Sequence, residues 1–161
     1  MTLTNKPKLM AFLMGSLAIS AGALVNYLGD KLLGVRLELF WGVSTFSPIW
    51  VLDLFLVPFI AGLVVSGIYG LGGKLLCYFA PIIVRTISYV QMNGMESQLP
   101  DGVTVLPFFY WILVLIVAIE AAAFGGVLGE IIIKRTYGRR PKHLVYKGSA
   151  NEPPSKTDSN G

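Results

Sequence analysis

The chain has 161 residues, of which 54% are hydrophobic and 14% are charged, and its formal net charge is +4. A soluble globular domain carries roughly 25% charged residues. This composition therefore excludes an ordinary soluble fold, which must cover a large surface relative to its core. The single cysteine and single histidine argue against haem, iron–sulfur, copper and zinc sites, which usually draw on several such ligands. We expect no cofactor and no metal.

The first apolar block covers about residues 9–28 and follows Lys6 and Lys8. This basic flank and the small-residue tripeptide at 21–23 are also typical of a signal peptide and its cleavage site. The block, however, reaches the ~20 residues that a membrane-spanning helix needs, more than the apolar region of a usual signal peptide. We therefore predict a retained transmembrane helix.

A mixed segment follows at residues 29–47, in which charged side chains are interspersed with apolar ones. Its apolar residues could line one side of a short helix lying in the membrane interface. We allow for such an interfacial helix between the first two transmembrane helices, with an apolar stripe formed by Leu32, Leu33, Leu37 and Phe40.

Three more apolar blocks complete the pattern. The second covers about residues 49–69, and the fourth, which is the longest, about 105–133. The third, at about 75–91, is short and contains Pro81 and Arg85. It either spans with a distortion or forms a re-entrant or interfacial helix.

The distribution of basic residues favours four spans over three. Basic residues concentrate on the cytoplasmic side of a membrane, close to the helix ends. Four spans place residues 1–8, Lys74 and the basic C-terminal segment on one side, whereas three spans would separate the two termini. Aromatic residues, which favour the interfaces, then fall at the outer boundary: Trp41, Trp50, Tyr89, Tyr110 and Trp111.

The predicted fold is an all-α integral membrane protein, a bundle of four transmembrane helices. Residues 1–8 form a cytoplasmic N-terminus, residues 9–135 the transmembrane domain, and residues 136–161 a cytoplasmic tail that is basic at first and then disordered. We expect a bacterial-type inner (plasma) membrane with both termini in the cytoplasm.

Small residues recur at four-residue spacing in the second and fourth blocks. Such rows let two helix backbones approach closely, which drives association in lipid. They serve either packing within the bundle or docking of another subunit. The helix-packing residues are Gly62, Ser66, Gly70, Ala121, Gly125 and Gly129.

Four ionisable residues lie inside the apolar blocks. A charge at the centre of a membrane costs about 2.5–3.5 kcal/mol or more, so each should have a partner or a watery cavity. Arg85 and Glu120 lie at similar depths when counted from the basic flanks of their blocks, and we predict that they pair. The pair would fix helix register, form a proton relay or ion path, or contact a partner subunit or lipid phosphate. Asp53 is interpreted as an interfacial helix cap, and Glu130 as an i,i+4 partner of Lys134.

Basic residues at and beyond the end of the fourth block are expected to contact anionic lipid headgroups. These residues are Lys134, Arg135, Arg139, Arg140 and Lys142. Nucleic acid is not an expected partner, because the chain has no folded basic domain.

No phosphate-binding glycine loop, Ser/His/Asp set or metal-ligand spacing is present in the sequence, so an enzyme is not expected. The function that these observations favour is a non-catalytic accessory subunit of a larger membrane complex, packing through its small-residue faces. The alternative is a small channel or oligomeric transport component that uses Arg85, Glu120 and Asp53. The expected partners are the lipid bilayer and either other membrane subunits or further copies of the chain. A membrane-embedded enzyme acting on lipid is a third, less supported class.

Overall fold

The computed structural model describes the backbone of residues 6–137 and the side chains of residues 9–136. Its four long apolar segments, Leu9–Leu33, Gly42–Tyr69, Gly73–Gly94 and Phe108–Thr136, are each long and apolar enough to cross a membrane. The prediction of an all-α, multi-pass membrane protein is therefore confirmed. The elements in chain order are α1 (Lys6–Leu33), β1 (Leu39–Phe40), α2 (Pro48–Tyr69), α3 (Gly73–Leu76), α4 (Phe79–Gly94), a 3₁₀ turn (Glu96–Gln98), β2 (Thr104–Val105) and α5 (Phe108–Tyr137).

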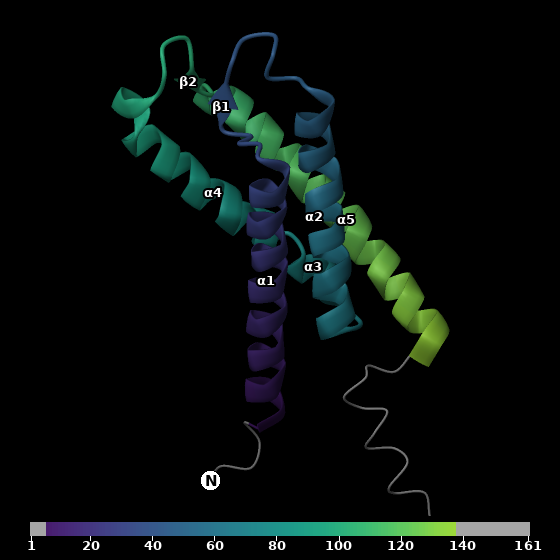
Figure 1. The fold of residues 1–161 in the computed structure, drawn as a ribbon. Coiled ribbons are helices and arrows are strands. Elements are labelled where there is room, and N and C mark those ends of the chain that lie inside the picture. The colour runs from purple at the N-terminus through teal and green to yellow at the C-terminus, as the bar shows by residue number, and fades with distance from the viewer. Residues whose placement is uncertain (1–5, 138–161) are drawn as a thin grey trace, which may run out of the picture.

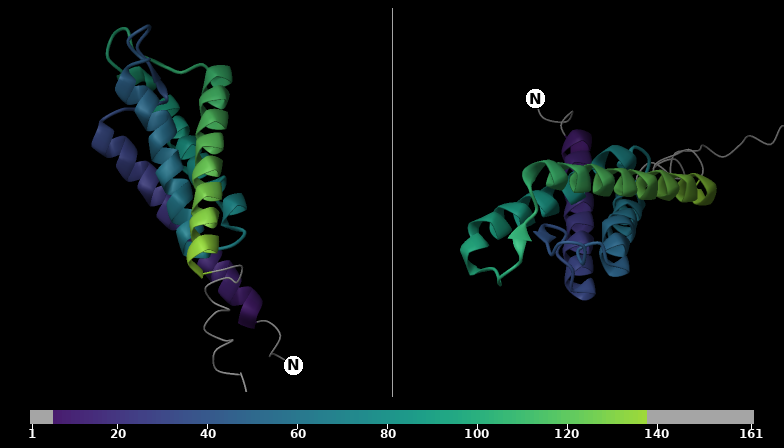
Figure 2. Two further views of the ribbon diagram at one scale, coloured as in Figure 1. Left: turned by 90° about the vertical axis from the view of Figure 1, so that its right-hand side faces the viewer. Right: turned by 90° about the horizontal axis from the view of Figure 1, so that it is seen from above.

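The helices run up and down along one long axis (Figure 1). The first residues of α1 and the last described residues of α5 lie at the same end of the bundle, and β1 and β2 lie at the opposite end. α2 and α5 pack against each other along most of their length, whereas α4 leans away from α2 toward the β1–β2 end, as Figure 1 and the view from above in Figure 2 show. α4 packs mainly against α1.

The close contact of α2 with α5 depends on small residues. A Cβ atom on Gly62 would collide with the backbone carbonyl of Ala122, and one on Gly125 with the carbonyl of Phe59. The Ser66 hydroxyl donates a hydrogen bond of 2.8 Å to the Gly126 carbonyl oxygen across the same contact. The small-residue rows therefore serve packing within this chain, which is the mechanism by which helices associate in lipid.

The other three members of the small-residue set lie at different places in the fold. Gly129 packs against the Ser66 side chain, in line with the row, and Ala121 is buried. Gly70, however, is buried without a close neighbour at the position of an added Cβ atom, and it ends α2 with a φ of +90°, a conformation that glycine adopts readily. Its assignment to helix packing is corrected: it is a helix C-cap.

The third apolar block is broken, as its proline indicated. The four-residue helix α3 ends at Leu76, and α4 begins at Phe79 after a turn. Pro81 is the third residue of α4, in the first turn, where no intrahelical N–H donor is lost. The two helices together run back from the end of the bundle where α2 terminates toward the β1–β2 end (Figure 1).

The interfacial helix allowed for within residues 29–47 is wrong. α1 continues through Leu33 and stops at Gly34, whose φ is +66°. The chain then makes a turn closed by a hydrogen bond from the Leu39 N–H to the Arg36 carbonyl oxygen, and Leu39 pairs with Val105 in a two-stranded antiparallel sheet. Leu37 is fully buried. The strand pairing satisfies backbone groups that an isolated surface segment would leave to water, and Leu39 is buried as well.

Candidate functional site

Arg85 of α4 is the centre of a buried charge cluster at the β1–β2 end of the bundle. Its side chain is 1% exposed. Nη2 lies 2.6 Å from Oδ1 of Asp30, and Nη1 lies 3.0 Å from Oδ2 of the same carboxylate, so the guanidinium donates to Asp30 through two parallel hydrogen bonds. Nη1 also donates to Oε1 of Glu38 at 3.3 Å. Such bidentate pairs are the strong form of the arginine–carboxylate interaction.

A third carboxyl group, that of Asp53 on α2, completes the cluster. Its Oδ2 lies 3.8 Å from Nη2 of Arg85, which is too far for a hydrogen bond, and its side chain is fully buried. Neither carboxyl oxygen of Asp53 has a hydrogen-bond partner. Oδ1 of Asn26, one turn before Asp30 on α1, and Nε of Arg85 are buried and unpartnered as well. Buried polar atoms without partners are rare and call for an explanation.

The segment between β1 and α1 supplies Glu38, which lies outside the membrane-spanning helices. The Glu38 backbone carbonyl accepts a 2.8 Å hydrogen bond from the Leu106 N–H, which holds this segment against the start of α5. Burial raises the pKa of the Glu38 carboxyl above its ordinary value, and the attraction of the Arg85 guanidinium opposes this shift only in part.

The cluster borders a recess of about 220 Å³ between α1 and α4. Asp30 and Glu38 line it, and the Asp30 side chain is 17% exposed there, whereas Asp53 lies behind them. The other lining residues come from α1, α4 and the segment that follows α1: Tyr27, Lys31, Val35, Arg36, Ser88, Gln91 and Met92.

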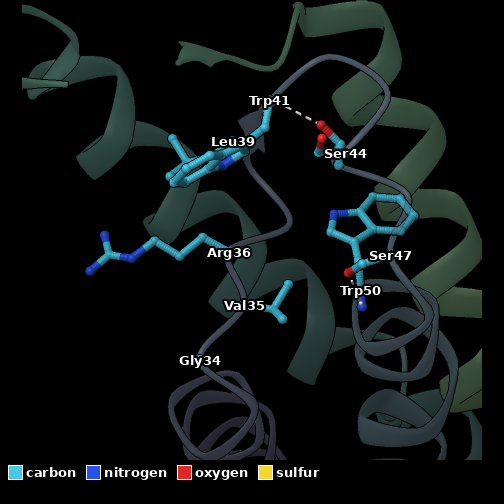
Figure 3. A pocket seen from close by; sticks show the side chains of 9 residues that line it. Gly34, Val35, Arg36, Leu39, Trp41, Ser44, Ser47 and Trp50 are labelled. Atoms are coloured by element: carbon cyan, nitrogen blue, oxygen red, sulfur yellow. Dashed lines mark hydrogen bonds between the residues drawn. The ribbon is translucent and has the colours of Figure 1, made fainter. Parts of the chain in front are cut away.

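A second recess, of about 330 Å³, lies beside the first at the β1–β2 end (Figure 3). Val35 and Arg36 line both recesses. In Figure 3 the Arg36 side chain points away from Trp50, and the Trp41 N–H donates a 2.6 Å hydrogen bond to the Thr45 hydroxyl. Arg36 is the one charged residue in this lining, so the second recess does not extend the acidic cluster.

The predicted pairing of Arg85 with Glu120 is corrected. Glu120 lies on the exposed side of α5 and takes part in no ion pair or side-chain hydrogen bond found within residues 9–136. The depth count that suggested the pair assumed straight helices, but the break after α3 and the lean of α4 bring Arg85 to the level of Asp53 instead. Asp53 lies only about 8 Å along α2 from Pro48, at 1.5 Å per residue.

Two further site assignments change. Asp53 is no interfacial cap, because the Ser47 hydroxyl caps α2 by accepting from the Trp50 N–H at 3.2 Å. Glu130 accepts hydrogen bonds from the backbone N–H groups of Gly72 at 2.9 Å and Lys74 at 3.2 Å. It therefore fastens the turn before α3 to α5, and the i,i+4 pair with Lys134 is not among the ion pairs of the described side chains.

The basic residues assigned to lipid contact are described in part. Lys134 and Arg135 are exposed in the last turns of α5. Arg139, Arg140 and Lys142 lie outside the described residues, as does most of the predicted tail at 136–161. Within the described part of the chain, no group of three or more His, Cys, Asp or Glu side chains is placed to hold a metal ion.

Sequence reasoning missed Asp30 and Glu38, the direct partners of Arg85. Their neighbours Lys31 and Arg36 made the segment look like a charged surface connection. One signal was present, since Asn26 and Asp30 share a helix face at i,i+4 spacing, next to an apolar block. Comparisons of the chain with protein-family models, curated proteins and solved structures find no match.

Proposed function

We propose that the chain is a non-catalytic accessory subunit of a larger membrane complex. The observation that carries this proposal is the exposure of Glu120 on a membrane-spanning helix. Glu120 belongs to a stripe of exposed apolar side chains at helical spacing along α5, formed by Leu113, Ile116, Phe124 and Val127. A carboxyl group on a lipid-facing helix surface indicates a site that another protein covers.

The depth of Glu120 makes this exposure costly. Gly62 of α2 packs against Ala122 of α5, so Glu120 lies level with the middle of the 22-residue helix α2. A charged side chain at that depth costs about 2.5–3.5 kcal/mol or more in contact with lipid. A hydrogen-bond donor or cation from a neighbouring helix lowers this cost, because ionisable residues inside membranes generally pair.

The occupant that fits best is a transmembrane helix of a different subunit. Two copies of this chain related by an axis along the membrane normal would bring residues of equal depth together. The described side chains offer no free cation to Glu120, because Arg85 lies at the level of Asp53, buried and bound to carboxylates. The remaining described basic side chains lie toward the helix ends: Lys31, Arg36, Lys74, Lys134 and Arg135.

The small residues are used for packing within the chain, so the exposed stripe around Glu120 on α5 is the surface that remains for docking. Gly62, Ser66, Gly125 and Gly129 are already occupied by the α2–α5 contact. The partner helix therefore meets large side chains around Glu120, and specificity comes from the polar contact to this carboxyl group.

The test uses the full chain in its native membrane, with a photo-crosslinking phenylalanine analogue at Phe124, one turn from Glu120. We expect a stoichiometric crosslink to a transmembrane helix that carries a basic or amide side chain at mid-depth. Glu120→Leu should abolish the crosslink and leave the chain folded, because the change makes the helix more apolar. Glu96→Gln, in the exposed 3₁₀ turn, is the matched control. A monomer with no crosslinked partner, or a crosslink only to a second copy, would contradict the proposal.

We also propose that the end of the bundle with Lys74, Lys134 and Arg135 faces the cytoplasm of a bacterial-type inner membrane. The positive-inside rule supports this orientation, and the first described residues of α1 lie at the same end (Figure 1). Reporter fusions after residue 161 and within residues 96–102 test it. Only the first should be active with a cytoplasmic reporter, and the reverse result would overturn the orientation.

A small transport component is the second candidate, and the buried Arg85–Asp53 contact favours it. Charged clusters inside membrane bundles often mark ion or proton pathways. Glu120 is not part of this cluster, so the candidate now rests on Arg85 and Asp53. Flux of protons or monovalent ions through reconstituted vesicles should be lost in Asp53→Asn. Unchanged flux in this variant would exclude the candidate.

A further inference from the structure

We propose that the cluster of Asp30, Glu38, Asp53 and Arg85 is an exchangeable proton-binding site, with one proton held between the carboxyl groups of Asp53 and Asp30. This inference goes beyond the subunit role and does not depend on it. Proton binding is a property of the cluster alone, whether or not another protein covers α5.

The geometry of Asp53 is the first argument. Arg85 donates one hydrogen bond to Asp30 from Nη1 and one from Nη2. The nearest oxygen of Asp53 lies 3.8 Å from Nη2. Both carboxyl groups thus converge on one nitrogen, with Asp30 at 2.6 Å and Asp53 at 3.8 Å. Two ionised carboxylates are acceptors only and cannot hydrogen-bond to each other. A proton on Asp53 supplies a donor and lets one of its two unpartnered oxygens form a hydrogen bond.

The charge balance is the second argument. One guanidinium faces three carboxyl groups, and a fully ionised cluster would hold two uncompensated negative charges inside the bundle. Burial disfavours charged forms, and carboxylates that share a site disfavour each other's ionisation. Asp30, which is paired through both oxygens, is the member best suited to remain ionised. Asp53, which is fully buried and lacks a hydrogen bond, is the member best suited to hold the proton.

The surroundings contribute few other charges. From α1 and the following segment, Lys31 and Arg36 line the recess, and from α4 only Arg85 enters the cluster. The side of the bundle formed by α2 and α5 is apolar and aromatic there, with Trp50, Leu54, Trp111, Val114 and Ala118 forming a buried core. Within residues 9–136, no charged side chain of α5 is paired with the cluster.

The recess between α1 and α4 provides the route of exchange. Asp30 is partly exposed in it, and Ser88 and Gln91 offer polar groups along its wall. A proton that enters the recess reaches Asp30 first and passes from there to Asp53. Asn26 precedes Asp30 by one turn of α1, and its buried, unpartnered Oδ1 can accept a hydrogen bond from a protonated carboxyl group or a water.

A proton fits this site better than a metal ion. The described residues include no group of acidic, His or Cys side chains arranged as metal ligands. The guanidinium of Arg85 already occupies the position that a cation would take between the three carboxyl groups. A monovalent cation that competes with the proton is an outcome that the experiment separates.

The experiment is infrared difference spectroscopy on the full chain in lipid nanodiscs, because a protonated carboxyl group has its own carbonyl stretching band. All samples carry Glu120→Gln, which removes the intramembrane carboxyl group exposed on α5, and isotope labelling distinguishes the remaining one, that of Glu130, from the aspartates of the cluster. We expect a protonated-carboxyl band at neutral pH that shifts in D₂O, is displaced by ¹³C-aspartate labelling, and is lost in Asp53→Asn. Asp101→Asn, an exposed loop acid, is the matched control and should keep the band.

Several results would overturn the proposal. These are the absence of the band at neutral pH, a band that only ¹³C-glutamate displaces, or a band retained in full in Asp53→Asn. Loss of the band on addition of sodium chloride would assign the site to a monovalent cation instead. The isotope labelling uses the unchanged cluster, so the proposal remains open to contradiction even if Asp53→Asn does not fold.

Discussion

Arg85 on α4 and Asp30 on α1 are joined by two hydrogen bonds, of 2.6 Å and 3.0 Å. The pair connects the third membrane segment to the first at the end of the bundle where α4 leans away from α2. Glu38 and Asp53 meet the same guanidinium, so a single side chain links α4 to α1, to α2 and to the segment that precedes β1. Arg85 therefore makes the main polar contacts that hold α4 against the rest of the bundle.

Removing Arg85 should therefore destabilise the fold strongly. Arg85→Leu leaves buried carboxyl groups without their cation, and breaking a buried ion pair from one side typically costs about 3–5 kcal/mol. The free energy of unfolding, measured in bicelles with added denaturing detergent, should fall by that order. Lys31→Leu, at an exposed position beside the recess, is the control and should change it by less than about 1 kcal/mol. Equal effects of both variants would mean that the cluster does not hold α4.

Gly62→Ala should destabilise the protein through the α2–α5 contact. Its new Cβ would collide with the Ala122 backbone carbonyl, which cannot move aside as a flexible side chain can. Overpacking of this kind costs about 1–3 kcal/mol. Gly67→Ala in the same helix is the control, because nothing lies within 4 Å of the added Cβ, and alanine favours the helix by about 0.5–1 kcal/mol. Thermal unfolding in detergent should move in opposite directions for the two variants, and a shared direction would contradict the packing account.

The sequence predicted the number of membrane segments because long apolar blocks report the solvent of a helix directly. It misplaced the end of the first helix for a tertiary reason. The predicted helix stopped at residue 28, since Asp30 and Lys31 looked like the exit from the membrane. α1 continues to Leu33 because Arg85, which is 55 residues further along the chain, neutralises Asp30 inside the bundle.

The sequence predicted only part of the candidate site: it identified Arg85 but not its partners. The insertion cost of a mid-membrane charge identified Arg85 as a residue in need of a partner. The partner itself depends on the break between α3 and α4, on the lean of α4, and on the turn before β1 that brings Glu38 back to the bundle. Neither feature leaves a local periodic signal, so a count of depths along straight helices selected Glu120, which the structure places on the outer surface of α5.

Glu130 should stabilise the connection between α2 and α4. It accepts hydrogen bonds from the N–H groups of Gly72 and Lys74, and Glu130→Ala leaves both partly buried donors without a partner, at about 1–3 kcal/mol for an unsatisfied group. The turn at residues 70–74 should then become more accessible. Hydrogen–deuterium exchange of its amides should speed up in Glu130→Ala and stay unchanged in Glu96→Ala. Unchanged exchange in both variants would show that the carboxyl group does not hold this turn.

Burial of Glu38 should make stability depend on pH. The pKa of this carboxyl group is raised above its ordinary value of 4.5, because burial outweighs the attraction of Arg85. The folded chain therefore binds this proton more tightly than the unfolded chain, and linkage requires the free energy of unfolding to fall as pH rises from 4.5 through the raised pKa. The contribution is fully present below the ordinary pKa and is lost above the raised one.

Glu38→Gln isolates this effect, since glutamine keeps the shape of the protonated acid and does not titrate. The stability of the wild-type chain relative to Glu38→Gln should be most favourable below the ordinary pKa and should decline toward neutral pH, as measured by thermal unfolding in bicelles. Glu96→Gln, in the exposed turn after α4, provides the comparison for a surface acid. A wild-type advantage that grows with pH would mean that the ionised Glu38–Arg85 pair is the stable form, because attraction to the guanidinium would then outweigh burial.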